Sequence, residues 1–158
     1  MPTLKEAAQD FLAQRRIAVV GVSRNPKGHG ANIVYKRLRD RGYEVFAVNA
    51  NADEVEGDQC FRDLKTIPGG VDAVVVGTAP EATDSVVQQC AELGISRVWI
   101  HRSFGEGSVP HSGAEHCGDA GVTCIAGGCP LMFKPAADVG HRVMKGMLGL
   151  GGKLPKQV

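Results

Sequence analysis

Residues 18 to 32 read AVVGVSRNPKGHGAN and bring glycines, a hydroxyl, amides and cations together directly after an apolar run. Gly21 permits a sharp turn, and a helical pattern starts at Gly30, so the backbone N–H groups of a helix N-terminus would face that turn. Ser23, Arg24 and Lys27 add a hydroxyl donor and two positive charges. Residue types in this order are typical of a site that holds phosphate groups.

The glycine spacing departs from the dinucleotide-binding motif G-x-G-x-x-G. Counted from Gly21, the second and third glycine positions hold Ser23 and Pro26. The next predicted strand ends at Asn49, where dinucleotide sites usually have an acid that binds the ribose hydroxyls. The absence of that acid also removes a charge that would repel a phosphate on the ribose. The pattern therefore favours a phosphate-rich adenine nucleotide over a nicotinamide dinucleotide.

A cysteine and a histidine offer a second kind of chemistry. Cys129 lies in GGCPLM after one predicted strand, and His101 follows another. A thiol and an imidazole at one sheet edge could attack a thioester, so this pair is a candidate for an enzyme. Cys90 and Cys124 lie in apolar patterns and are expected to be core thiols. No metal site is predicted, because no common zinc-ligand spacing occurs among His111, His116, Cys117, Cys124 and Cys129.

The elements that must position these residues alternate along the chain. Buried strands are predicted from unbroken apolar runs at 17–22, 44–49, 71–77, 97–100 and 122–126. Helices are predicted after capping boxes at Thr3 and Thr78, and also at 30–41, near 110–120 and near 135–148. This alternation predicts a parallel sheet with helices on both faces.

We therefore expect a Rossmann-like three-layer α/β/α fold with a five-stranded parallel sheet. In such sheets the ligand lies beyond the carboxyl ends of the strands. The loops expected to share that edge begin at Gly21, Asn49, Gly77, His101 and Gly127.

Composition limits the classes of function. The 158 residues match one domain, predicted for 1–148 and followed by a flexible Gly-rich tail at 149–158. A formal net charge of +1 gives no field that would attract nucleic acid or a membrane surface. The N-terminal segment has acids among its apolar residues, unlike a signal peptide or a membrane span. Five cysteines without a C-x-x-C pair fit a reducing compartment and mostly free thiols. We expect a cytoplasmic protein with a small-molecule partner and allow for a homo-oligomer.

Four segments together resemble a known family, namely VVGVSRNPKGHGANIVYKRLRDRGYEVFAVN, VDAVVVGTAPE, GISRVWIH and GGCPLM. Their order and spacing are similar to those of the small stand-alone coenzyme A-binding proteins. These proteins resemble the N-terminal nucleotide-binding domain of the succinyl-coenzyme A synthetase α-subunit. The resemblance covers residues 14 to 133 and implies coenzyme A or an acyl-CoA as the cofactor.

The resemblance also implies where the parts of the cofactor lie. Its phosphates would lie along Gly21, Val22, Ser23, Arg24, Asn25 and Lys27, with Asn49 beside them. The adenine and its ribose would lie near Thr78, Ala79 and Pro80, and the pantetheine arm would run toward His101 and Cys129. After the fourth predicted strand, where many relatives have a glutamine and then a glycine, this chain reads WIHRSFGEGSV. Because the synthetase's phosphohistidine domain and ATP-grasp partner have no counterpart here, ligase activity is not expected.

These observations predict non-catalytic binding of coenzyme A or an acyl-CoA. Two alternatives stay open at this point. One is a thioester enzyme that depends on Cys129 and His101, which fast alkylation of Cys129 would favour. The other is a sensor module for a nicotinamide dinucleotide, which stabilisation by NAD would favour.

Overall fold

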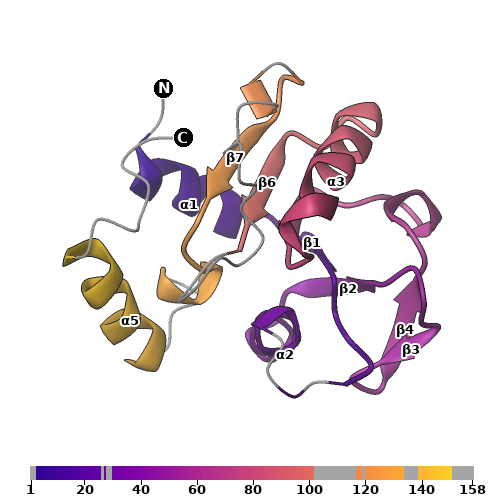
Figure 1. Ribbon diagram of the computed structural model, residues 1–158, viewed down its shortest axis with the longest axis horizontal. Coiled ribbons are helices and arrows are strands. Elements are labelled where there is room, and N and C mark those ends of the chain that lie inside the picture. Colours follow the sequence, from indigo (N-terminus) through magenta and orange to yellow (C-terminus); the bar gives the residue numbers. More distant parts are fainter. Residues whose placement is uncertain are drawn as a thin grey trace.

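A twisted sheet of seven strands runs through the centre of the molecule (Figure 1). The computed structural model describes residues 3–25, 27, 30–101, 117–118, 120–133 and 139–150. In spatial order the strands are β3 (Glu54–Val55), β4 (Asp58–Phe61), β2 (Glu44–Val48), β1 (Arg16–Val20), β5 (Ala73–Val76), β6 (Arg97–Ile100) and β7 (Thr123–Ala126). All neighbours are parallel except β3 and β4. The Rossmann-like α/β fold is thus confirmed.

The number of strands was predicted wrongly, because β3 and β4 add a hairpin where the sequence suggested a loop. Their two-residue turn, Glu56 and Gly57, has φ values of 51° and 80°, as in the turns that join antiparallel strands most tightly. β4 then pairs with β2 in parallel, with Cys60 opposite Ala47. These strands have two and four residues. They are too short and too polar to give an apolar run.

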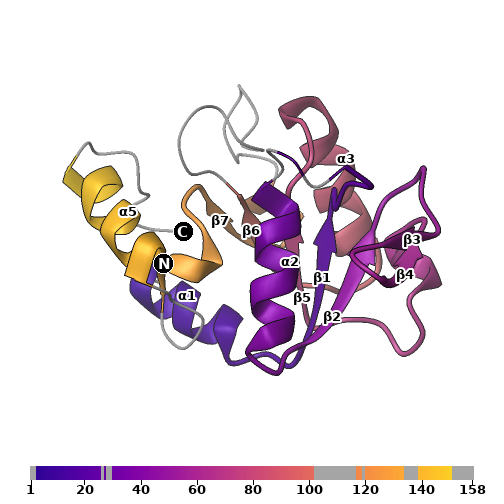
Figure 2. The ribbon, with the colours of Figure 1, turned by 90° about the horizontal axis from the view of Figure 1, so that it is seen from below.

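Helices cover both faces of the sheet. They are α1 (Leu4–Leu12), α2 (Gly30–Asp40) and α3 (Pro80–Glu92). Helix α5 (Val139–Leu150) packs against η2 (Pro130–Met132), which like η1 (Leu64–Thr66) is a short 3-10 turn. Figure 2 shows α1 and α2 on one side of the sheet and α3 on the other, and two separate groups of buried side chains match this arrangement. The three-layer arrangement follows from this.

Alternate residues of each central strand supply these two cores. Ile17 and Val19 of β1 face α1 and α2, whereas Ala18 and Val20 face α3. Trp99 of β6 is buried on the α1 side, where its indole N–H donates to the carbonyl of Gly127 at 3.0 Å. A continuous apolar run correctly predicted these strands, because both faces of each strand are buried.

Several helix boundaries in the structure differ from those predicted from the sequence. The Thr3–Glu6 capping box is present, but α3 is capped at Ala79 without a side-chain bond. The predicted box at Thr78 is therefore wrong, because Pro80 occupies the first turn and the helix starts one residue later. Helix α5 continues to Leu150, past the predicted start of the tail. Most of the helix expected near 110–120, and positions 151–158 of the tail, lie outside the described residues.

Cys124 is buried as predicted, but it is not a free thiol. It forms a disulfide with Cys117, with the two Cα atoms 5.9 Å apart. A turn brings the pair together, in which the N–H of Val122 donates to the carbonyl of Cys117 at 2.9 Å. The sequence did not predict this disulfide, because the two cysteines are seven residues apart and belong to no repeated cysteine motif. Cys60, Cys90 and Cys129 are free and buried.

Candidate functional site

The loops that follow the parallel strands begin at one level, at the carboxyl edge of the sheet. In each case the N–H of the first loop residue donates to the carbonyl oxygen of the last residue of a neighbouring strand, with N···O distances of 2.8 to 2.9 Å. These bonds run from Gly21 to Val48, from Gly77 to Val20, from Asn49 to Phe61, from His101 to Val76 and from Gly127 to Ile100. The prediction that these five loops share an edge is confirmed.

Two glycines let three parts of the backbone meet at this edge. Gly21 has φ 97°, and a Cβ atom there would lie 2.6 Å from the carbonyl oxygen of Gly77. A Cβ atom on Gly77 would lie 2.5 Å from the Cβ of Ala31, in the first turn of α2. The ends of β1 and β5 and the start of α2 are therefore in direct contact. This contact fixes the N-terminus of α2 at the carboxyl edge of the sheet, as the glycine pattern predicted.

The loop after β1 is shaped by bonds among its own groups. The N–H of Ser23 donates to Oδ1 of Asn32 at 2.8 Å, and Nδ2 of Asn32 donates to the carbonyl of Ser23 at 2.8 Å. The N–H of Asn25 donates to Oγ of Ser23, and the N–H of Lys27 donates to Oδ1 of Asn25. These three N–H groups already have acceptors. An anion here would therefore depend more on the exposed side chains of Arg24 and Lys27 and on the start of α2.

Asn32 is the residue in this loop system that sequence reasoning missed. Its side chain is 1% exposed and also donates to Oε1 of Glu56 in the β3–β4 turn at 2.8 Å. It thereby connects α2, the loop after β1 and the hairpin. The available signal was an asparagine one turn before Tyr35 on the buried side of the helix.

A cavity of about 380 Å³ opens beside this loop, on the α3 side of the sheet. Gly21, Asn49 and Thr78 line it, so the structure brings these three predicted site residues together. Sequence reasoning missed most of the remaining wall, which includes Asn51, Arg62, Ala82, Ser85, Val86 and Gln89. Asn51 and Arg62 flank the hairpin that the sequence did not reveal. The other four lie on the face of α3 that meets the sheet edge.

Asn49 ties the two loops beside this cavity to each other. Its Nδ2 donates to the carbonyl of Val22 at 2.9 Å, and its Oδ1 accepts from the N–H of Asn51 at 2.8 Å. Val22 itself is buried, so its carbonyl rather than its side chain serves the site. Asn49 thus positions the loop after β1 and does not simply replace the missing acid.

Of the three predicted site residues at the start of α3, only Thr78 lines the cavity. The hydroxyl of Thr78 lies 3.5 Å from that of Thr83, and Thr78 faces the cavity. Ala79 and Pro80 are not among the residues that line it. Ala79 is the N-cap of α3, and Pro80 is its first helical residue.

His101 and Cys129 differ sharply in access. The ring of His101 packs over the start of α2, since a Cβ on Gly30 would lie 2.8 Å from its Cε1 atom. Cys129 follows β7, but its side chain is 0% exposed and packs in the core with Leu131 and Met132. A thiol without solvent access lacks a basic requirement of a nucleophile. This burial argues against the alternative of a thioester enzyme.

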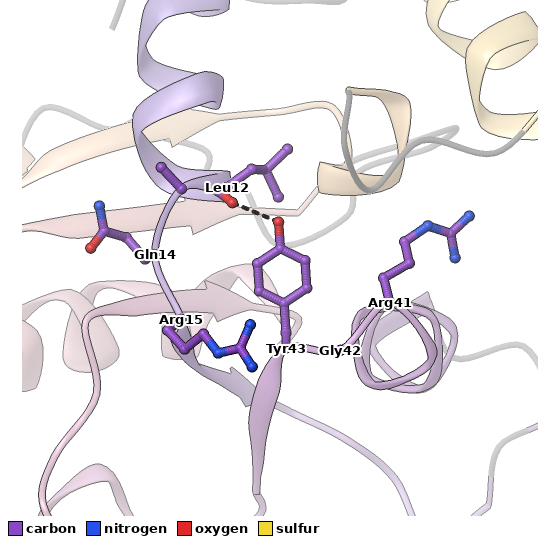
Figure 3. A pocket seen from close by; sticks show the side chains of 7 residues that line it. Leu12, Gln14, Arg15, Arg41, Gly42 and Tyr43 are labelled. Atoms are coloured by element: carbon purple, nitrogen blue, oxygen red, sulfur yellow. Dashed lines mark hydrogen bonds between the residues drawn. The ribbon is translucent and has the colours of Figure 1, made fainter.

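A second cavity, of about 350 Å³, lies at the opposite edge of the sheet, before β1 and β2 (Figure 3). Arg15 and Arg41 border it, and the hydroxyl of Tyr43 donates to the carbonyl of Leu12 at 2.6 Å. Burial raises the pKa of Tyr43, so the hydroxyl keeps its proton. None of the predicted site residues lines this cavity.

Neither a cluster of metal-ligating side chains nor a membrane-spanning helix occurs in the described part of the chain. No three His, Cys, Asp or Glu side chains gather there to hold a metal ion, and His111 and His116 lie outside it. No helix in the described ranges is long and apolar enough to cross a membrane.

The protein-family model described as "CoA binding domain" matches residues 15–135. Among curated proteins, the chain is 35% identical over 98 residues to the ADP-forming acetate–CoA ligase II subunit alpha of Pyrococcus furiosus, covering 61% of this chain and 21% of that subunit. It is 31% identical over 103 residues to the uncharacterized protein YneT of Bacillus subtilis, covering 65% of this chain and 76% of YneT.

The fold is also similar to that of solved structures. A hypothetical protein from Pyrococcus horikoshii superimposes with a TM-score of 0.71 and 29% identity, over 80% of this chain and 87% of that one. The chain spans only about a fifth of the Pyrococcus furiosus ligase subunit, whereas it spans most of YneT and of the Pyrococcus horikoshii protein.

Proposed function

The chain belongs to the CoA binding domain family, and from this premise we propose that it binds coenzyme A or an acyl-CoA without catalysing a reaction on it. The observation that carries the proposal is the cavity beside the loop after β1. It lies at the carboxyl edge of the sheet, within the family match, next to a helix N-terminus and two exposed cations.

The proposal assigns each part of the coenzyme to a different part of this edge. The diphosphate lies at the start of α2, beside Ser23, Arg24 and Lys27, where the helix dipole and two charges favour an anion. The adenosine occupies the cavity between Asn49 and α3. The pantetheine arm then leaves toward His101, whose ring borders the start of α2.

A binding role agrees better with the described residues than the two alternatives. The thiol of Cys129 is buried, which disfavours a thioester enzyme. The nicotinamide sensor is disfavoured because Ser23, Pro26 and Asn49 replace the residues of the dinucleotide motif. Ligase activity is not proposed, because the match covers 21% of the ligase subunit. The cytoplasmic location and the homo-oligomer remain predictions.

The experiment is a thermal unfolding series with coenzyme A, acetyl-CoA and NAD. A ligand at 100 times its dissociation constant adds about 2.7 kcal/mol to the free energy of unfolding. In a domain of this size that corresponds to a melting temperature higher by about 5–11 °C. We expect this rise with coenzyme A or acetyl-CoA and none with NAD. Equal rises with NAD and coenzyme A would contradict the proposal, and so would no rise with either CoA compound.

A further inference from the structure

Arg62 is the cationic side chain in the wall of the cavity at the carboxyl edge. It follows β4, so the hairpin that the sequence did not reveal is what delivers it there. The side chain is 53% exposed, which leaves it open to a ligand in the cavity. The chain thus places a guanidinium group, paired with Asp53, beside Asn49, where the second long strand ends, and the carboxylate of Asp63 lines the same cavity.

The guanidinium group is held in one orientation. Nε and Nη2 both approach Oδ1 of Asp53, at 2.9 and 2.8 Å, and Nη1 donates to the carbonyl of Ala50 at 2.8 Å. A guanidinium has five N–H donors, so these contacts leave two N–H groups that are bonded to no residue in the described ranges. Both belong to the terminal nitrogens. Such a pair of donors suits a phosphate group.

The position of Arg62 matches the place of a ribose. In Rossmann-like sheets the ribose lies at the end of the second strand of the first β-α-β unit, which here is β2 and Asn49. Ala50, whose carbonyl fixes the guanidinium, is the next residue in the chain. Arg24 and Lys27 belong instead to the loop that leads into α2, on the path of the diphosphate. Arg62 lines the cavity together with Asn49, and Arg24 and Lys27 do not, so Arg62 is the better candidate to bind a phosphate carried on the ribose.

We propose that Arg62 is the specificity-determining residue that binds the ribose phosphate of coenzyme A, and that the cavity beside it is selective for 3′-phosphorylated adenosine. This inference rests on the proposed function. It leaves Arg24 and Lys27 to the diphosphate.

The test compares coenzyme A with dephospho-coenzyme A by calorimetric titration. Arg62→Gln removes the charge at similar length, and Arg62→Lys keeps the charge without the planar fork. The Arg24→Gln and Lys27→Gln double variant tests the competing assignment. Arg15→Gln, at the opposite edge of the sheet, controls for the loss of one exposed arginine. Adenosine 3′,5′-bisphosphate and AMP repeat the comparison without the pantetheine arm.

We expect Arg62→Gln to weaken coenzyme A binding about 10- to 100-fold and dephospho-coenzyme A binding less than about 3-fold, from the usual strength of a charge-assisted hydrogen bond. The double variant should weaken both ligands alike. Arg62→Lys should fall between Arg62→Gln and the unchanged protein, which separates loss of charge from loss of folding. Melting temperatures without ligand report on folding directly.

Two results would overturn the inference. In one, Arg62→Gln weakens both coenzymes equally. In the other, the loss specific to coenzyme A appears only in the Arg24 and Lys27 variant. Failure of the unchanged protein to bind either coenzyme would instead contradict the proposed function, so the two failures can be told apart.

Discussion

Gly21→Ala should separate the two reasons for a glycine at the end of β1. One reason is the backbone conformation, since φ is 97°. The other is space, because the new methyl group would lie 2.6 Å from the carbonyl oxygen of Gly77 and 2.8 Å from its carbon. Both are backbone atoms of Gly77, the residue directly after β5, so neither can move aside without shifting the end of the strand.

The size of each contribution can be estimated from a matched position. Gly42 has φ 85°, and a methyl group added there would meet no atom within 4 Å, so Gly42→Ala carries the conformational cost alone, about 1–2 kcal/mol. Gly21→Ala adds the cost of overpacking against a fixed backbone, about 1–3 kcal/mol. The expected totals are about 1–2 kcal/mol for Gly42→Ala and about 2–5 kcal/mol for Gly21→Ala.

Thermal and urea unfolding of the two variants and the unchanged protein measure these values. At about 3 °C per kcal/mol, the melting temperature should fall by about 3–6 °C for Gly42→Ala and by about 6–15 °C for Gly21→Ala. A fall of the same size in both variants would refute the argument. It would mean that the strand ends can separate freely, and that the direct contact between β1, β5 and α2 does not hold the site together.

Two further predictions concern ionisation and access. Hydrogen bonds from Tyr35 and Arg39 hold the pKa of Asp58 below its ordinary value. The carboxylate of Asp58 therefore stabilises the fold at pH values above its ordinary pKa, and this stabilisation is lost as the pH falls through the lowered pKa of the folded protein. Asp58→Asn should therefore cost about 1 kcal/mol at pH 7, a value that allows for partial exposure, and the difference in urea unfolding should shrink as the pH falls through the lowered pKa. A constant difference across this range would show that the carboxylate charge is not responsible. All three free cysteines are buried, and burial raises the pKa of Cys90 to about 12, so iodoacetamide should modify each of them far more slowly in the folded protein than in urea, as peptide mass spectrometry can measure; rapid modification of Cys129 in the folded protein would restore the thioester alternative.

The central sheet was predictable because its strands are buried on both faces. The RIAVV and AVVV segments leave no polar alternation that another element could explain. The β3–β4 hairpin was not predictable in the same way, because Val55 and Cys60 are its buried apolar side chains and Glu54 and Gln59 point outward. A hairpin of this length is fixed by its turn and by pairing with β2, which are properties of the folded chain.

In the candidate site too, the residues that follow the predicted strands could be placed from the sequence, and those that depend on the hairpin could not. Gly21, Asn49 and Thr78 follow strands, so the topology alone places them together at the sheet edge. Arg62 depends on the missed hairpin and therefore could not be placed. Cys129 shows a different limit, because its position after β7 predicts an edge but not the direction of the side chain, which turns into the core.

The internal hydrogen bonds of the loop after β1 have a thermodynamic consequence. Asn32 and the side chains of Ser23 and Asn25 give the described part of this loop its shape without any ligand. Ordering a backbone residue costs about 1–2 kcal/mol, and here that entropy is lost when the protein folds and not when a ligand arrives. Because the described part of the loop has its shape before a ligand arrives, more of the contact energy made there can appear as binding affinity.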